Sequence, residues 1–287
     1  MALPTPSDLA APATGDMAGT SAFTYSLAPF SLGPGEEKIN CYYVPPSGVD
    51  RYLNRIVVDM NAGSHHLVVF RVKDDKGLPA TGPTPCTQLD LPSGLDGMLP
   101  GSQQLHSEIP LPDGVALLLA KDEGLYFQSH YINATVKDII TTSVTYNFTT
   151  VDAALVKQKA GMIFYSNYGL NVPPGMSIAT RSCSAPQDMN LITATGHMHK
   201  HGLTFDATVA GASIYHTDHW DEPNGALFPA PGQAVKKGDP IQWACAYNND
   251  TNATLVFGNS AVTNEMCIFA GIYYPAQDSQ TLFSCEM

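Results

Sequence analysis

The amino-acid sequence predicts an all-β protein made of antiparallel sandwich or barrel sheets. Many short runs are rich in β-branched and aromatic residues, and Pro/Gly/Asp/Asn clusters such as VPPSG and KKGDP separate them. No long stretch has helical periodicity. The 24 glycines and 22 prolines supply the turns that so many short strands require.

The strand-like runs follow one another along both halves of the chain. In the first half they are 51–60, 65–72, 114–120, 126–133 and 141–150. In the second half they are 161–170, 203–211, 212–218, 241–247, 253–258 and 266–275. Their lengths and their spacing are typical of antiparallel sandwiches.

A domain boundary is predicted between 150 and 160. The stretch VDAALVKQKAGM has a modest helical or linker-like pattern, and strand patterning starts again after it. The first residues are rich in Ala, Pro, Thr, Gly and Ser, which is typical of a flexible linker. We therefore expect a flexible tail over 1–30, a first sandwich over 31–155 and a second over 156–287, with no repeat detectable between the halves.

The charge balance excludes several partners. The formal net charge is −12 with only 14 Lys and Arg, so no basic patch is available for nucleic acid or an anionic membrane surface. No run of about 18 apolar residues is present, so no membrane-spanning helix is expected. The N-terminus lacks the basic and apolar regions of an intact signal peptide.

Cysteine usage indicates an oxidising compartment. The six cysteines, which form no CxxC pair, are Cys41, Cys86, Cys183, Cys245, Cys267 and Cys285. An even number of widely spaced cysteines favours three disulfides in a secreted, periplasmic or otherwise extracytoplasmic protein over six buried thiols. Four Asn-x-Thr sequons, at Asn133, Asn147, Asn249 and Asn252, are compatible with secretion.

The stretch ATGHMHKHG places His197, His199 and His201 at alternate positions. On a strand these side chains share one face, with neighbours about 6–7 Å apart, so the outer two cannot easily chelate one ion. We expect His197 and His199 to bind a metal together with a third ligand from elsewhere. The alternative is a face of hydrogen-bonded histidines.

Further candidate ligands stand in both halves. His65 and His66 are adjacent and His130 lies in YFQSHYIN. Adjacent residues of a regular strand face opposite ways, so His65 and His66 can share a metal only through local distortion or different ring nitrogens. We predict that one binds through Nδ1 and the other through Nε2. Met266 begins an apolar run and is either a core residue or a soft thioether ligand for Cu(I).

These residues, taken in order, resemble the copper type II, ascorbate-dependent monooxygenases. The resembling pieces are the His65-His66 pair, the YFQSHYIN stretch with His130, AGMIFYSNYGLNVPPG, the His197-x-His199 pair and NEMC…YYP with Met266. They run along most of the chain after about the first 35 residues. Each piece is common, but five pieces in one order with matching spacing are not.

The resemblance implies two jelly-roll-like sandwiches that face each other across a cleft and hold one copper each. One copper, on His65, His66 and His130, would store an electron. The other, on the catalytic residues His197, His199 and Met266, would bind O₂ beside a small-molecule substrate, with ascorbate as the reductant. The resemblance also implies the disulfides Cys41–Cys86, Cys183–Cys285 and Cys245–Cys267.

The substrate positions depart from the peptide-amidating branch of this family. Where that branch has an Arg, an Asn and a Tyr that anchor a carboxylate, this chain has Thr195, Ile268 and Ala270. A peptidylglycine substrate is therefore disfavoured. Glu265, Asp218, Asp221 and Glu222 could attract an amine, but we interpret them as solvated surface carboxylates.

The remaining histidines and tryptophans receive structural interpretations. His201 is expected to hydrogen-bond or to lie in the cleft, and His106, His216 and His219 to lie on the surface. Trp220 and Trp243 are expected in the core or in the cleft wall. Superoxide dismutases, multicopper oxidases and cupins also carry His-x-His on β folds, but their accompanying ligands are missing. The main alternative to an enzyme is a non-catalytic copper-binding protein on the same scaffold.

Overall fold

The computed structural model describes residues 13–17, 20–73, 78, 82–87, 94–277, 282–283 and 285. The chain divides into two compact units, Met1–Lys159 and Ala160–Met287. Nearly all regular structure in both units is antiparallel sheet, so the all-β prediction is confirmed.

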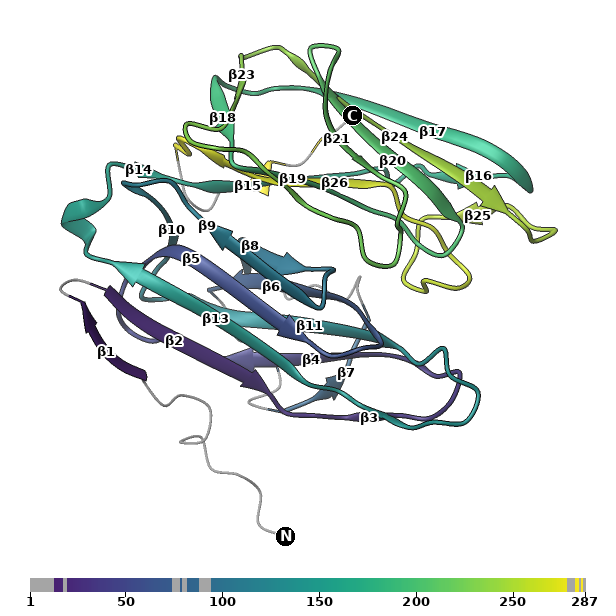
Figure 1. The fold of residues 1–287 in the computed structure, drawn as a ribbon, viewed down its shortest axis with the longest axis horizontal. Coiled ribbons are helices and arrows are strands. Elements are labelled where there is room, and N and C mark those ends of the chain that lie inside the picture. Colours follow the sequence, from purple (N-terminus) through teal and green to yellow (C-terminus); the bar gives the residue numbers. More distant parts are fainter. Residues whose placement is uncertain are drawn as a thin grey trace, which may run out of the picture. The chain divides into compact units, whose positions relative to one another are not determined.

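The first unit contains two large sheets (Figure 1). One has the order β1 (Ala13–Met17), β2 (Thr20–Leu27), β13 (Val144–Val151), β5 (Arg51–Met60), β10 (Val115–Leu119), β14 (Gln158–Lys159), with β9 (His106–Pro110) beside β5. The other has the order β7 (Thr84–Pro85), β4 (Glu37–Val44), β11 (Gly124–Ile132), β6 (Ser64–Val72), β8 (Leu95–Ser102). A small pair, β3 (Ser31–Leu32) and β12 (Ile140–Thr141), completes the unit.

Aromatic side chains pack between these two sheets. The Phe127 ring on β11 lies 5.9 Å from the Tyr25 ring on β2 and 5.5 Å from the Tyr146 ring on β13. Phe127 and Tyr146 are fully buried. Residues on β13 alternate between buried and half-buried, as expected for a strand with one face in a core. The first unit is therefore a β-sandwich.

The expected flexible tail over 1–30 is wrong for its C-terminal part. Residues 20–27 form β2, which pairs with β13 along its whole length. Phe23, Tyr25 and Leu27 alternate with small polar residues and turn to one face, where Phe23 stacks on Phe148 at 5.2 Å. In the sequence, the many Ala, Ser and Thr residues make this alternation of apolar and polar side chains hard to recognise. The part of the predicted tail over 1–12 and 18–19 lies outside the described residues.

The stretch that suggests a boundary contains a single short turn of 3₁₀ helix, η2 (Ala153–Leu155). The Asp152 carboxylate accepts the Ala154 N–H and caps this turn. β14 then pairs with β10 in parallel. The modest helical pattern of VDAALVKQKAGM therefore corresponds to a single capped turn followed by a short strand.

The second unit also has two main sheets (Figure 1). One has the order β22 (Ala226–Leu227), β19 (Thr193–His197), β26 (Ile268–Tyr274), β15 (Gly161–Ser166), β27 (Leu282–Phe283), with β18 (Met189–Leu191) paired to β26 and to β23 (Gln233–Val235). The other has the order β17 (Gly175–Ser184), β24 (Pro240–Asn249), β20 (Gly202–Val209), β21 (Ala212–Thr217). A small pair joins β16 (Asn171–Val172) and β25 (Leu255–Val256).

The core of the second unit lies between these sheets. Trp243 on β24 is 1% exposed and stacks on Tyr165 of β15 at 5.9 Å between ring centroids. Phe269 on β26 belongs to the same apolar cluster. Trp243 is thus a core residue, and Trp220 packs against the cluster half-buried. The second unit is likewise a β-sandwich.

Three disulfides connect the six cysteines as Cys41–Cys86, Cys183–Cys285 and Cys245–Cys267. These are the pairs that the family resemblance implies. One lies in the first unit and two lie in the second. Among the described residues, no helix is long and apolar enough to cross a membrane.

In each unit, a buried asparagine at the end of one long strand makes the same set of hydrogen bonds, which we call an asparagine brace. After β11, the Asn133 amide donates to the Leu32 and Asp138 carbonyls, and its oxygen accepts from the Thr135 hydroxyl at 2.7 Å. At the last residue of β24, the Asn249 amide donates to the Val172 and Ala253 carbonyls, and its oxygen accepts from the Thr251 hydroxyl at 2.7 Å. Both asparagines are buried.

Candidate metal centres

His65, His66 and His130 come together in the first unit because β6 contains a β-bulge. His130 on β11 faces His66, but Tyr131 faces Ser64, so His65 is an extra residue in the ladder. A bulge interrupts the alternation of side chains and redirects one of them. Local distortion is one of the two ways in which the adjacent pair could share a metal, and the structure contains it.

The three rings form a compact buried cluster. Their centroids lie 4.7 Å apart for His65 and His66, 5.0 Å for His65 and His130, and 4.9 Å for His66 and His130. Each ring offers one nitrogen within 4.8 Å of the others. All three side chains are at most 3% exposed. This first centre, His65/His66/His130, fits a transition metal that accepts imidazole ligands and does not suit Mg²⁺ or Ca²⁺.

Glu37 at the start of β4 determines which nitrogen of His130 is available. Its Oε1 lies 2.9 Å from His130 Nε2. A carboxylate accepts hydrogen bonds, so Nε2 carries the proton, and Nδ1 is the His130 nitrogen that could bind a metal. The sequence alone does not indicate Glu37, because the position of this residue opposite Ile132 depends on the pairing of β4 with β11.

The motif GHMHKHG in the second unit spans the C-terminal end of β19. In this motif Gly196 and Met198 face the core. A Cβ on Gly196 would lie 2.3 Å from the Phe205 ring, so a side chain at this position would collide with the core. Met198 is 1% exposed within the same apolar cluster. Because side chains alternate, His197 and His199 project to the opposite face.

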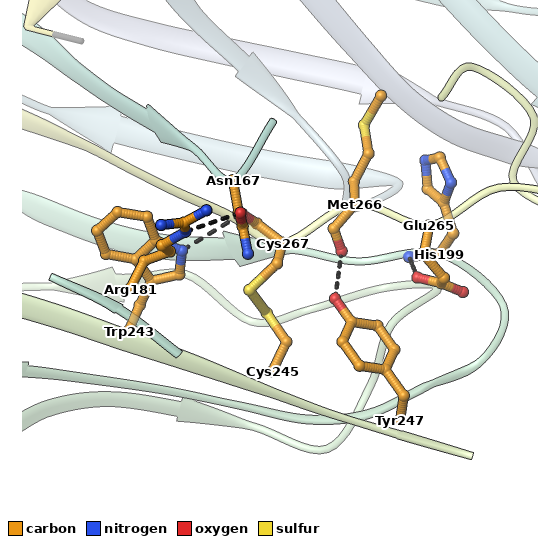
Figure 2. The surroundings of a disulfide bond; sticks show 9 residues. All are labelled: Asn167, Arg181, His199, Trp243, Cys245, Tyr247, Glu265, Met266 and Cys267. Atoms are coloured by element: carbon orange, nitrogen blue, oxygen red, sulfur yellow. Dashed lines mark hydrogen bonds between the residues drawn. A yellow bond between two sulfur atoms is a disulfide. The ribbon is translucent and has the colours of Figure 1, made fainter. Parts of the chain in front are cut away.

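Met266 lies just beyond the end of the ladder between β19 and β26. His197 lies opposite Ile268 and Thr195 opposite Ala270, so these four side chains share one face. Met266, two residues before Ile268, follows the same alternation. The His197 and His199 rings are 5.1 Å apart, and the Met266 side chain extends on the same side of the chain as the His199 ring in Figure 2. We call His197, His199 and Met266 the second centre.

The ring contacts of His199 and His201 differ. His199 Nδ1 lies 3.2 Å from the Asn264 carbonyl and therefore donates to it, so Nε2 is the nitrogen that could bind a metal. His201 Nδ1 lies 3.2 Å from Asp250 Oδ1, and its Nε2 lies 3.4 Å from the Val262 carbonyl. With both nitrogens engaged, His201 is a hydrogen-bonding residue, as expected.

Glu265 is buried, and its interpretation as a surface carboxylate is wrong. Its side chain is 0% exposed, whereas Asp218, Asp221 and Glu222 are exposed as predicted. Its Oε2 accepts the His199 backbone N–H at 3.0 Å and its Oε1 accepts the His201 backbone N–H at 2.7 Å. Burial raises the pKa of the Glu265 carboxyl to about 7, although these hydrogen bonds oppose the increase.

The backbone around Met266 is held by one face of β24 (Figure 2). The Tyr247 hydroxyl donates to the Met266 carbonyl at 2.7 Å, Cys245 is bonded to Cys267, and Trp243 Nε1 donates to the Cys267 carbonyl at 3.3 Å. Trp243, Cys245 and Tyr247 alternate along β24 and are buried. The run IQWACAY therefore carries three successive anchors for the methionine segment. The sequence alone does not indicate this role.

The face that carries His197 has no carboxylate clamp. Thr195, Ile268 and Ala270 contribute a hydroxyl and aliphatic groups, and Phe164 on β15 lies opposite Ala270. Thr195, Ala270 and Phe164 are half-buried and Ile268 is buried. The paired positions next to His197 are thus uncharged.

The other histidines lie on the surface as predicted. His106 is exposed beside Asp59 at 2.6 Å, and His216 is exposed beside Asp206 at 2.7 Å. His219 is exposed 3.4 Å from Asp218. None of them belongs to the clusters that could hold a metal among the described residues.

Residues 164–286 match the family model of the copper type II ascorbate-dependent monooxygenase, C-terminal domain. The resemblance that the motifs indicate is therefore confirmed for this part of the chain, which spans most of the second unit. The matched segment contains His197, His199 and Met266. It defines the second unit as similar to a domain of copper- and ascorbate-dependent oxidoreductases.

No curated protein matches the sequence. Among solved structures, the major capsid protein of bacteriophage PM2 is 7% identical, with 88% of this chain and 97% of that chain covered and a TM-score of 0.34. A conserved protein of unknown function from Pseudomonas aeruginosa is 9% identical, with 94% of this chain and 90% of that chain covered and a TM-score of 0.23. TM-scores this low do not indicate a shared fold.

Proposed function

We propose that this protein is a copper-dependent monooxygenase that hydroxylates a C–H bond of a small organic substrate, using O₂ and a reductant such as ascorbate. The observation that carries the proposal is the family match over 164–286, a segment that contains the His197-x-His199 pair and Met266. In this proposal 31–155 and 156–287 are the two copper-bearing domains, jelly-roll-like and facing across a cleft.

The first centre would hold one copper through His65, His66 and His130. The hydrogen bond between His130 Nε2 and Glu37 supports binding through His130 Nδ1, because the carboxylate keeps the proton on the other nitrogen. We further predict that one of His65 and His66 binds the copper through Nδ1 and the other through Nε2. The family resemblance supports a role in electron storage.

The second centre would hold the other copper through His197, His199 and Met266. The bond from His199 Nδ1 to the Asn264 carbonyl supports binding through Nε2. A thioether is a soft ligand, so Met266 favours Cu(I), the oxidation state that meets O₂. These three side chains are the proposed catalytic residues.

When bound, the two coppers and ascorbate would supply the two electrons with which O₂ is split while one of its oxygen atoms enters the C–H bond. The chain's own residues position the substrate and control which groups lie beside it. Thr195, Ile268, Ala270 and Phe164 present no charge next to His197. We therefore propose an uncharged substrate, or a substrate whose charged group lies far from the reacting carbon, and not a peptidylglycine.

We propose an extracytoplasmic location, either secreted or periplasmic. Three disulfides support it, because such bonds persist mainly in oxidising compartments.

The decisive experiment combines metal analysis with ascorbate-driven O₂ consumption. The purified chain is loaded with copper, and a panel of small uncharged and charged substrates is tested with the wild type, His130→Ala and Met266→Ala. We expect two coppers per chain in the wild type, a lower copper content in both variants, and substrate-dependent O₂ consumption in the wild type alone.

Two matched controls separate ligand loss from general damage. His106→Ala removes an exposed histidine of the first unit, and Met176→Ala removes an exposed methionine of the second unit. Both should behave as the wild type. Equal O₂ consumption by all variants would contradict the monooxygenase, and copper binding without turnover on any substrate would indicate a non-catalytic copper-binding protein.

A further inference from the structure

The buried Glu265 carboxylate is connected to both parts of the second centre. Through its two oxygens it accepts the backbone N–H groups of His199 and His201, at 3.0 Å and 2.7 Å. Through its own peptide bond it is joined to Met266. Within the described part of the chain, no Lys or Arg lies within ion-pair distance of this carboxylate, so backbone donors carry its hydrogen bonds.

The place of these bonds in the sheet explains why a side chain is needed. The ladder between β19 and β26 ends at the pair His197 and Ile268. His199 and Met266 both lie beyond this last pair, where no strand pairing holds the two segments side by side. The Glu265 carboxylate connects the two segments there, because it bonds to the peptide of His199 from the residue next to Met266. The His199 ring adds a second connection through its hydrogen bond to the Asn264 carbonyl.

The chain around the motif depends on this connection. After His199 the backbone turns sharply, with the Gly202 N–H donating to the His199 carbonyl at 2.9 Å. A Cβ on Gly202 would lie 2.8 Å from the Met198 Cβ, so the turn is tightly packed on its inner side. On its other side the two hydrogen bonds to Glu265 hold the turn against the methionine segment.

We infer that Glu265 is a positioning residue that sets the distance between the imidazole ligands and the thioether ligand of the second centre. The inference rests on the proposed function, because it takes His197, His199 and Met266 as the ligand set. Glu265 contacts neither substrate nor ligand atoms in this role. It acts through the backbone of His199 and through its own neighbour.

The chemistry of substitution follows from the two hydrogen bonds. Glu265→Gln keeps the length of the side chain but has one acceptor oxygen, so one of the two N–H groups faces an amide NH₂ group. Glu265→Asp keeps two acceptor oxygens on a side chain that is one methylene shorter. Gln should therefore disturb the centre more than Asp, although Gln alone keeps the size of the residue.

The test measures the copper–sulfur bond directly. All variants carry His65→Ala and His130→Ala, so that only the second centre can bind copper. The full chain is loaded with Cu(I), sulfur scattering from the metal is measured by X-ray absorption spectroscopy, and Cu(I) affinity is measured by competition with a chelator. Glu222→Gln, an exposed glutamate of the same unit, is the matched control.

We expect Glu265→Gln to lose sulfur scattering and to bind Cu(I) about 10- to 100-fold more weakly, the usual consequence of removing a group that orients a metal ligand. Glu265→Asp should retain part of the sulfur signal, and Glu222→Gln all of it. Tryptophan fluorescence checks folding, since both tryptophans lie in the second unit. If Glu265→Gln does not fold, the X-ray absorption spectrum of Glu265→Asp is the test of the inference.

Two negative outcomes have different meanings. If the wild-type background shows sulfur scattering and Glu265→Gln shows the same signal, the inference alone is overturned. If Glu265→Gln does not fold, an unchanged signal in Glu265→Asp has the same meaning. Absence of sulfur scattering from the wild-type background would overturn the ligand set of the proposed function, and the inference with it.

Discussion

The two candidate centres differ in how the backbone holds their ligands. His66 and His130 face each other inside a ladder that continues on both sides of them, and a bulge adds His65. His199 and Met266 lie beyond the end of their ladder. The Glu265 side chain joins the segments that carry them, and Tyr247 holds the Met266 segment from β24. Regular strand pairing is thus sufficient to build the first centre, whereas the second depends on Glu265, Tyr247 and a disulfide.

This difference predicts different responses to substitution. The first centre should tolerate loss of a single side-chain contact, because many backbone hydrogen bonds fix its strands. The second centre should respond to changes at residues that never contact a metal. The following variants test this contrast, from the largest expected effect to the smallest.

Removing the disulfide beside Met266 should have the largest effect. Cys245 and Cys267 are separated by 22 residues. For a loop of this size the chain-entropy model predicts a loss of about 3 kcal/mol in unfolding free energy. Denaturant unfolding of Cys245→Ala/Cys267→Ala, followed by tryptophan fluorescence, reports on the second unit alone because Trp220 and Trp243 both lie there.

The matched control is Cys41→Ala/Cys86→Ala, which removes the disulfide of the first unit. It should leave the tryptophan transition unchanged. An equal shift of that transition in both double variants would show that the disulfide acts on the whole chain and not on the methionine segment.

Gly196→Ala should destabilise the second unit through overpacking. The new methyl group would meet the Phe205 ring at 2.3 Å, and such insertions into a packed core cost about 1–3 kcal/mol. The same fluorescence transition measures the loss. Gly225→Ala, where nothing lies within 4 Å of an added Cβ, is the control and should have no effect. An unchanged transition in Gly196→Ala would mean that Phe205 moves freely.

Glu37→Gln should weaken copper binding at the first centre about tenfold, because His130 loses the carboxylate that fixes its proton on Nε2. Cu(I) competition in a His199→Ala background isolates that centre. Glu108→Gln, an exposed glutamate of the same unit, should bind as the background does. If Glu37→Gln lost all copper, the claim that strand pairing suffices for this centre would fail.

Tyr247→Phe should have the smallest effect on stability, about 1 kcal/mol, since it removes one buried hydrogen bond to the Met266 carbonyl. Tyr42→Phe is matched to it, because the Tyr42 hydroxyl donates to the Ala28 carbonyl at the same distance of 2.7 Å in the first unit. Only Tyr247→Phe should shift the tryptophan transition and alter the copper–sulfur spectrum. A normal sulfur signal in Tyr247→Phe would leave Glu265 and the disulfide as the supports of Met266.

The sequence predicts those features that depend on local patterns. Alternation in TTSVTYNFTT predicts β13, and the His-x-His spacing predicts that His197 and His199 share a face. For the adjacent pair His65-His66 the sequence leaves two alternatives, local distortion or different ring nitrogens, and the structure contains a bulge at this place. In each case the deciding information lies within a few residues.

Features that depend on strand order could not be predicted in this way. Glu37 and His130 are 93 residues apart in the sequence, and they meet only because β4 pairs with β11. Glu265 was expected on the surface because charged residues usually lie there, but the backbone donors of a distant turn make its burial possible. The β2 strand was missed because its small polar residues outweigh three alternating apolar ones.

The asparagine braces limit where an oligosaccharide could be attached. Attachment requires a free side-chain nitrogen, but in the folded chain the Asn133 and Asn249 amides each donate to two carbonyls and are buried. Asn147 is half-buried, and Asn252 is exposed in the loop after β24. Of the four acceptor sequences, Asn252 alone offers an exposed amide, so at most a small part of this surface could carry sugar.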